Sequence, residues 1–273
     1  MSEVDPGRLA SRPRLYRRLS GLRVCSEPGL LPMIEAVSDE HTWGVVNSIG
    51  FDDAQLDRLR RGWAYPQSAR RPLHPLLAAG VRREHRRVLS YRQKDEAVFE
   101  LAAWAQGLGL SHRQVAAFEQ AADELLLNAL FDAPVNAEGT PRYLTYTPQQ
   151  RLLIMAEPHD AAWLSYAADE QRVVVAVHDP FGRLRRPTVL DYFRRCALAQ
   201  EARQSPLERK AGGAGVGLYL VLSSASELLF RLCPGRSTEV VLAIYRQRPY
   251  TLRALCFEEY AAKPVLRAPS DPR

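Results

Sequence analysis

The chain has 273 residues, of which 46% are hydrophobic and 25% are charged, and its formal net charge is +6 at pH 7. These values are ordinary for a soluble globular protein with a sizeable core. No apolar run reaches the ~18 residues of a membrane span and the N-terminus lacks a signal-peptide core, so we expect a cytoplasmic protein. The four cysteines form no CxxC pair, which argues against a zinc site and a disulfide framework: Cys25, Cys196, Cys233 and Cys256.

Nearly all of the positive excess lies in the N-terminal third, where residues 1–90 hold fifteen arginines against ten acidic residues. A basic patch of this kind can attract nucleic acid or an acidic protein partner. Because only three of the 37 basic residues are lysines, the arginine content indicates a coding bias. We therefore favour a solvated basic face and do not expect nucleic acid as a partner.

The first 80 residues carry weak signals for a small α/β region that serves as a docking segment of unknown role. Between residues 21 and 65, short apolar stretches alternate with a helical pattern that Asp52 is placed to cap. Residues 64–75 contain three prolines and indicate a linker.

The signals are stronger from residue 81 onward. The spacing of apolar side chains over 94–110 predicts a helix that ends at a glycine pair. Ser111, with Gln114 three residues later, forms a capping-box pattern that begins a second helix. That helix must end before Pro134.

Strands and helices then follow one another to residue 247. Strands are predicted over 151–157, 162–168, 172–179, 227–233 and 238–245, and helices over 187–202 and 216–226. Helices gathered against mostly antiparallel strands predict an α+β fold, a two-layer α/β sandwich with the helices on one face. We divide the chain into an N-terminal region (1–80), a main domain (81–247) and a C-terminal tail (248–273) with a short helix over 252–262.

Three polar side chains share one face of the helix that precedes Pro134. Glu124 and Asn128 are four residues apart, and Asp132 lies one turn further along. An asparagine inside a helix is mildly unfavourable and calls for a reason. A polar surface stripe is one interpretation. The other is a metal and nucleotide site, in which the amide oxygen binds Mg²⁺ and the carboxylate orients or deprotonates a hydroxyl group.

Two further segments point to a ligand. Asp179 ends the apolar strand in "VVVAVHDPFGRL", where an aspartate begins a turn or, when buried, accepts a hydrogen bond from an adenine amino group. "KAGGAGVGLYL" (210–220) brings four glycines to a helix start, which allows either a tight turn or a phosphate close to backbone N–H groups. The second segment fits neither a P-loop nor a dinucleotide fingerprint, but it does fit GxGxGL.

In this order, E-x-x-x-N on a helix, D-x-x-G after a strand and GGxGxGLxL at a helix start resemble the N, G1 and G2 boxes of the GHKL ATPase superfamily, which includes the catalytic domains of histidine kinases. The resemblance covers residues 85–246 and implies the Bergerat ATP-binding fold. Within the superfamily, the segments resemble most the anti-sigma-factor serine kinases and other stand-alone ATP-binding regulatory proteins.

The resemblance implies ATP and Mg²⁺ as cofactors. It makes Glu124 the catalytic carboxylate and Asn128 the Mg²⁺ ligand. It assigns the adenine amino group to Asp179, with Thr238 supporting it through a shared water, and makes Gly182 a wall of the adenine pocket. It further implies a movable lid over 183–211, and the remaining nucleotide-binding positions are Asp132, Lys210, Gly213, Gly215, Val216, Gly217 and Leu218.

One position departs from the family pattern, because Phe181 stands where the G1 box usually carries a glycine. No histidine lies in the setting of an autophosphorylating histidine kinase. Three functions stay open: a protein serine/threonine kinase that acts on a regulatory partner such as a sigma factor or an anti-anti-sigma factor, a non-catalytic ATP-sensing module that binds a partner, and an ATP hydrolase. We favour the kinase because Glu124 is retained beside Asn128, and a homodimer is left open.

Overall fold

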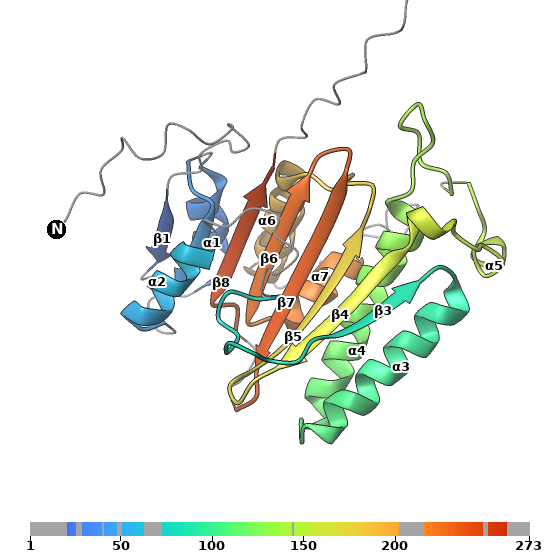
Figure 1. Ribbon diagram of the computed structural model, residues 1–273. Helices are drawn as coiled ribbons and strands as arrows, with labels where there is room; N and C mark the ends of the chain where they lie inside the picture. The colour runs from blue at the N-terminus through green and yellow to red at the C-terminus, as the bar shows by residue number, and fades with distance from the viewer. Residues whose placement is uncertain are drawn as a thin grey trace, which may run out of the picture.

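A mixed sheet of eight strands forms the centre of the described structure (Figure 1). The computed structural model describes residues 21–25, 29–39, 41–47, 51–62, 73–143, 145–201, 216–247 and 251–260. The strand order across the sheet is β1-β2-β8-β6-β7-β5-β4-β3. The strands are β1 (Leu22–Cys25), β2 (Gly44–Asn47), β3 (Glu84–Val88), β4 (Ala162–Ala168), β5 (Arg172–Asp179), β6 (Glu227–Cys233), β7 (Ser237–Tyr245) and β8 (Ala254–Glu259).

Most neighbouring strands in this sheet are antiparallel. Only β1 with β2 and β6 with β8 pair in parallel among the described strands. The two N-terminal strands reach the middle of the sheet through β8, which lies between β2 and β6. Strands from the three predicted regions 1–80, 81–247 and 248–273 therefore belong to one sheet, and the boundaries themselves stay predictions.

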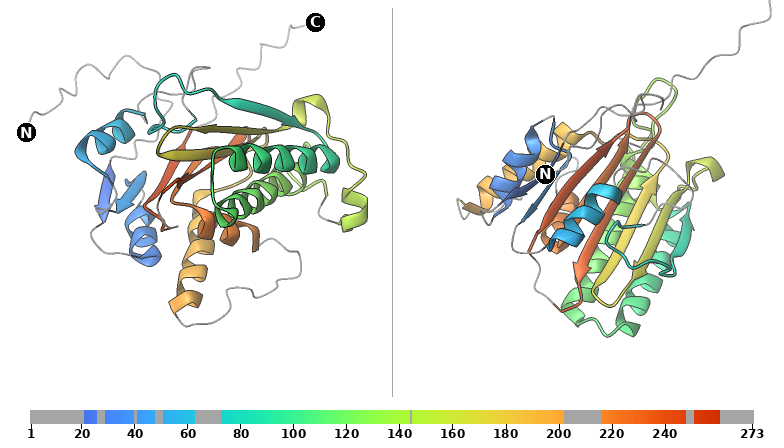
Figure 2. Two further views of the ribbon diagram at one scale, coloured as in Figure 1. Left: turned by 90° about the horizontal axis from the view of Figure 1, so that it is seen from below. Right: turned by 60° about the vertical axis from the view of Figure 1, so that its left-hand side comes forward.

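Five helices cover one face of the sheet, and they form the second layer of the sandwich (Figure 2, left). The pairs α3–α4, α4–α7 and α1–α6 pack directly against each other. The predicted α+β class with a helical layer is thus confirmed. The helices of this layer are α1 (Leu30–Ser38), α3 (Tyr91–Gly107), α4 (His112–Leu127), α6 (Arg186–Glu201) and α7 (Val216–Ser224).

Strand β5 explains why the sequence carries an unbroken apolar run here. Val173, Val175 and Val177 face the helical layer, whereas Val174 and Ala176 belong to a second core cluster on the opposite face. Side chains of a strand alternate between the two faces. An apolar residue at every position therefore means that β5 is buried on both sides.

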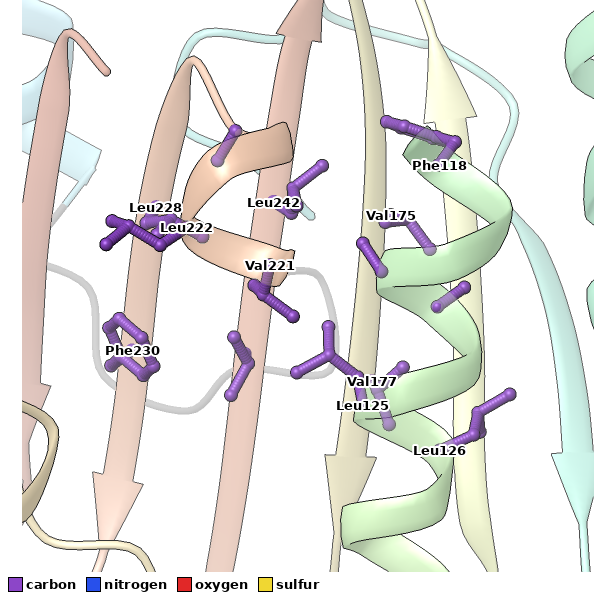
Figure 3. Packing of buried hydrophobic residues seen from close by; sticks show 14 of the residues in the cluster. Phe118, Leu125, Leu126, Val175, Val177, Val221, Leu222, Leu228, Phe230 and Leu242 are labelled. Atoms are coloured by element: carbon purple, nitrogen blue, oxygen red, sulfur yellow. The ribbon is translucent and has the colours of Figure 1, made fainter. Parts of the chain in front are cut away.

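The principal core lies between α4, α7 and the sheet (Figure 3). Phe118 of α4 lies near Val175 of β5, and Leu125 of α4, Val221 of α7 and Phe230 of β6 belong to the same cluster. All five side chains are almost fully buried. Burying side chains of this size stabilises the fold by about 1.5–3 kcal/mol each. This packing fixes α4 and α7 relative to β5.

The opposite face of the sheet is covered in part by α2 (Asp53–Gly62) and by the chain that follows residue 73 (Figure 2, right). Leu59 of α2 packs there with Leu73 and Leu76 against Val241 of β7. Helix α2 belongs to the N-terminal region that the sequence analysis set apart from the sandwich, and it packs on the face opposite to the helical layer. The amphipathic pattern of α2, capped by Asp52 as predicted, provides the apolar stripe for this contact.

A buried polar cluster joins this second face to the segment after residue 73. The Glu227 carboxylate accepts hydrogen bonds from Arg172 Nε at 3.2 Å and from the Tyr245 hydroxyl at 2.5 Å, and His74 Nε2 lies 3.0 Å from its other oxygen. Burial alone would raise the pKa of Glu227, but His74 and Arg172 lower it to about 2. The charge of Glu227 is thus well compensated inside the protein.

Two local predictions were wrong, and one strand was missed. Residues 252–262 were expected to contain a helix, but Ala254–Glu259 form β8, where neighbouring strands on both sides supply hydrogen bonds. Residues 151–157 were expected to form a strand; instead the short helix α5 (Pro148–Arg151) ends there and a loop follows. Strand β3 was not foreseen at all.

Candidate functional site

Asp179 ends β5 in a buried position and holds the loop that follows. Its Oδ1 accepts hydrogen bonds from the backbone N–H groups of Phe181 at 2.9 Å and of Gly182 at 3.1 Å. Burial raises the pKa of Asp179, and these two hydrogen bonds oppose that rise. Because both donors bind Oδ1, Oδ2 is the oxygen with capacity for a further donor.

Thr238 lies directly opposite Asp179 in the pairing of β5 with β7. Hydrogen bonding between the two side chains lowers the pKa of Asp179, although by strict geometry the buried Thr238 hydroxyl oxygen has no partner among the described residues. A buried polar oxygen without a partner is costly, which is why such groups are rare. The pair therefore offers an acceptor and an unsatisfied hydroxyl to a polar ligand, as the resemblance implies for an adenine amino group.

Gly182 is required by its backbone and by its surroundings. Its φ angle is +61°, and a Cβ atom there would lie 2.6 Å from Ser237 N and 2.7 Å from Arg236 N, with Cys233 O closer still. Its carbonyl oxygen also accepts a hydrogen bond from Gly235 N at 3.0 Å. The loop after β5 is therefore seated on the turn between β6 and β7, and only glycine fits at this point.

Phe181, the position that departs from the family pattern, is buried beside Gly182. The Arg142 guanidinium lies over its ring at 5.5 Å from the centroid. The ring of Phe181 thus packs inside the protein, and the guanidinium of Arg142 lies beside the loop that follows β5.

Glu124 lies on α4, which begins at the predicted capping box of Ser111 and Gln114. Its carboxylate packs against the first turn of α7: a Cβ atom on Gly217 would meet Oε2, and would lie 3.2 Å from Cδ. Burial raises the pKa of Glu124, Asp123 raises it further, and Lys94 lowers it. A side chain at residue 217 would displace this carboxylate. The close contact with Glu124 therefore explains why one position of the glycine-rich segment is a glycine.

Asn128 stands where α4 changes its hydrogen-bond pattern. Its carbonyl oxygen accepts the hydrogen bond of Ala133 N at 2.8 Å, five residues on, and the π-helical turn η2 (Asn128–Asp132) results. Turns of this kind occur frequently at functional sites because they reorient side chains at the end of a helix. The sequence did not indicate the π-helical turn.

Asp132 is the third member of the predicted polar face, and it lies between two arginines. Arg151 Nη1 is 3.7 Å from its Oδ1, and Arg183 donates to its backbone carbonyl at 2.5 Å. Burial raises the pKa of Asp132, whereas the charges of Arg151 and Arg183 lower it. The contact with Arg183 connects η2 to the loop that Asp179 and Gly182 form.

Lys94 is the residue of this region that sequence reasoning missed. It lies on α3 with 2% of its side chain exposed, forms an ion pair with Asp123, and lies 2.8 Å from Asp95 Oδ1. Burial alone would lower the pKa of Lys94, but its two carboxylate partners raise it. The one available signal was a lysine on the apolar side of a predicted helix. Lys94 places a positive charge next to the residue that precedes Glu124.

The glycine-rich segment is described only from residue 216. Val216 begins α7, Gly217 is buried against Glu124, and Leu218 packs against the principal core. Lys210, Gly213 and Gly215 lie outside the described residues, as do residues 202–211 of the predicted lid.

The described part of the predicted lid, residues 183–201, contains the helix α6. Arg186, the first residue of α6, binds the N-terminal region. The buried guanidinium of Arg186 donates to the carbonyl oxygens of Val37, of Asp39 at 3.0 Å and of Thr42 at 2.6 Å. It also lies 3.5 Å from the Glu259 carboxylate. The N-terminal end of this segment is therefore anchored to the chain between α1 and β2.

Together these contacts bring the predicted residues to the C-terminal half of α4. Gly217 lies against Glu124 of α4. The loop of Asp179 and Gly182 is linked to the turn that follows α4 by the hydrogen bond from Arg183 to the backbone carbonyl of Asp132. No group of three or more His, Cys, Asp or Glu side chains suited to a metal occurs within the described part of the chain. A single amide ligand that shares Mg²⁺ with phosphates does not need one. None of the described helices is long and apolar enough to cross a membrane.

Comparison with known proteins assigns the chain to no family. No family model matches the chain, and no curated protein matches it either. A chain in the crystal structure of the SiaB-SiaC complex from Pseudomonas aeruginosa has 16% sequence identity and a TM-score of 0.39, over 59% of this chain and 88% of that chain. The fold and site therefore define an α+β protein with a buried acidic and glycine-lined site, and no family is assigned.

Proposed function

We propose that the protein binds Mg-ATP at this site and regulates a partner protein, as a serine/threonine kinase of the anti-sigma-factor type. The observation that supports the proposal most is the convergence on α4: Glu124 lies against Gly217, while Asp132 is tied to the loop of Asp179. These two contacts link the described parts of three segments predicted separately from the sequence, and that linkage supports the proposal. The orphaned hydroxyl of Thr238 beside Asp179 suits the edge of an adenine ring.

Each residue has one task in this proposal. Asp179 and Thr238 hold the adenine amino group, and backbone N–H groups at the start of α7, near Gly217, hold the phosphates. Asn128 contributes its amide oxygen to Mg²⁺. Bound Mg-ATP supplies the phosphoryl group that is transferred.

Glu124 is the group that accepts the proton of the attacking hydroxyl. Burial raises its pKa, which brings it closer to the range in which a carboxylate is an effective general base. The positive charge of Lys94 opposes that rise in the pKa of Glu124. The same carboxylate can activate water, so the hydrolase differs from the kinase only in the nucleophile.

The second candidate is a module that senses ATP without catalysis. The anchoring of α6 by Arg186 favours it, because a nucleotide-dependent shift of the following segment would be transmitted to the N-terminal region. In this case Glu124 has only a packing role against Gly217.

The variant Glu124→Gln separates these candidates because it keeps the shape that packs against Gly217 and removes the base. The kinase or hydrolase predicts an ATP dissociation constant within about threefold of the wild type, and ADP formation slowed by about 100-fold or more. Glu119→Gln, an exposed residue on the same helix, is the matched control. Equal ADP formation in all three proteins would reject Glu124 as the base. Absence of ATP binding would reject the site itself.

A further inference from the structure

An exposed apolar patch lies in the chain between η2 and β4, around α5. Leu153 is 85% exposed and Met155 is 64% exposed, whereas Ile154 between them packs against the core. Ile154 therefore anchors the segment to the core, and Leu153 and Met155 on either side of it face solvent. The patch consists of Tyr146, Leu152, Leu153 and Met155. Contiguous exposed apolar groups of this kind mark interaction sites in soluble proteins.

Four arginines border this patch, and each is held by acceptors of the protein. Arg142 lies 2.5 Å from Asp160 Oδ2 and donates through Nε to Val135 O at 2.7 Å. Arg151 donates to the carbonyl oxygen of Tyr143 at 3.4 Å. The four arginines of this basic border are Arg142, Arg151, Arg183 and Arg185, and the carboxylates paired with them are Asp132 and Asp160.

Contacts and chain connectivity link the basic border to the apolar patch. Arg183 contacts Asp132, Asp132 is paired with Arg151, and Leu152 and Leu153 follow Arg151 in the chain. The ring of Tyr146 packs on Tyr143, at 5.3 Å between centroids, and Tyr143 also accepts the hydrogen bond from Arg151. Of the four guanidinium groups, those of Arg142 and Arg151 are paired with carboxylates and those of Arg183 and Arg185 donate to backbone carbonyl oxygens, while Glu138 and Glu157 are the exposed acidic residues of the same segment.

We propose that this surface binds an acidic segment of a partner protein, with apolar anchors on the patch and carboxylates on the basic border. Guanidinium groups held in fixed positions suit the planar carboxylates of a polypeptide, which they bind through two parallel hydrogen bonds. A second copy of this chain is disfavoured, because the chain itself carries a formal charge of +6 and would bring like charges together.

This surface is where we expect the partner of the proposed function to bind. The effect of partner binding on nucleotide binding rests on that proposed function. A carboxylate that binds Arg151 competes with Asp132 for the same guanidinium. Asp132 belongs to η2, which begins at Asn128, so docking changes the charge around the proposed nucleotide site. Partner binding and nucleotide binding are then coupled through Arg151 and Asp132.

The test uses fluorescent synthetic peptides and the full chain, without nucleotide. One amphipathic helical peptide combines Leu with Glu, and its charge-inverted counterpart combines Leu with Lys. The wild type is expected to bind the acidic peptide about tenfold or more tightly than the basic one. The double variant Leu153→Ser, Met155→Ser is expected to lose about tenfold or more in affinity for the acidic peptide. Phe99→Ser, which changes a side chain that is 74% exposed on α3, is the control and leaves the affinity unchanged.

Several outcomes would overturn the proposal. Equal affinity for the two peptides would remove the role of the basic border, and equal loss in the double variant and in Phe99→Ser would remove the role of the patch. Binding to phosphatidylserine vesicles without binding to the acidic peptide would assign the surface to a membrane. Dimerisation that the double variant abolishes would assign it to a second copy. Because the assay contains no nucleotide, a failure of ATP binding leaves its outcome unaffected.

Discussion

Replacing Gly182 by alanine tests the account of the loop after β5 most sharply. At φ +61° an alanine costs about 1–2 kcal/mol relative to glycine, and the gain from a less flexible unfolded chain offsets about 0.4–1 kcal/mol of that. The new methyl group would also lie 2.6–2.7 Å from the backbone nitrogens of Ser237 and Arg236, which cannot turn away as a side chain can. Forcing an extra carbon into a packed site costs about 1–3 kcal/mol. The expected loss is therefore about 3 kcal/mol.

The chain contains a matched control for this variant. Gly235 has nearly the same φ, +72°, but a Cβ atom there would meet nothing within 4 Å. Gly235→Ala should cost only about 1 kcal/mol of stability, since only the unfavourable positive φ angle opposes the alanine there. Equilibrium unfolding in urea, followed by circular dichroism, measures both losses. Equal losses in the two variants would refute the claim that close packing on the β6–β7 turn, rather than the φ angle alone, makes Gly182 necessary.

Three further predictions concern other contacts of the site and its support. Gly217→Ala should cost less than about 1.5 kcal/mol of stability, because the flexible Glu124 side chain can move, but ADP formation should fall as it moves. Glu227 has its pKa lowered from 4.5 to about 2, so it contributes about 3 kcal/mol of stability above pH 4.5 that is lost as the pH falls toward 2. Unfolding free energies measured from pH 6 to pH 2 should show this loss in the wild type, and the same slope in Glu227→Gln would contradict it. Arg186→Met should cost about 3 kcal/mol in urea unfolding, because it leaves buried carbonyl oxygens unpaired, whereas Arg194→Met on the exposed side of α6 should cost less than about 1 kcal/mol.

Local patterns predicted the elements that carry the site. The capping box of Ser111 and Gln114 and the spacing of Glu124 and Asn128 are properties of a single helix, and a single segment of sequence displays them. The apolar run that ends at Asp179 predicted β5 because both faces of that strand are buried.

The errors arose where distant parts of the chain decide the structure. The segment 252–262 has a helical pattern, but pairing with β2 and β6 makes it a strand, and nothing within the segment shows these partners. The apolar run after α5 was taken for a strand. The capping box of Thr147 and Gln150, with Pro148 between them, was a local signal for the helix that the structure contains.

The ion pair of Lys94 was equally out of reach, because its partner Asp123 lies on another helix. The sequence also gave no indication that Arg186 binds the chain between α1 and β2, which precedes it by more than a hundred residues. Contacts of this length depend on the packing of α6 against α1, and only the three-dimensional structure contains them.

The most direct test of the central claim is calorimetric titration of Mg-ATP into the wild type, Asp179→Ala and Asp169→Ala. Asp169 is the matched control, because its Oδ1 accepts hydrogen bonds from Gln171 N and Arg172 N in a similar turn, away from the proposed site. The account predicts saturable binding in the wild type and in Asp169→Ala, and loss of binding in Asp179→Ala. No binding by the wild type at millimolar ATP, or equal binding by all three proteins, would contradict the assignment of the adenine site.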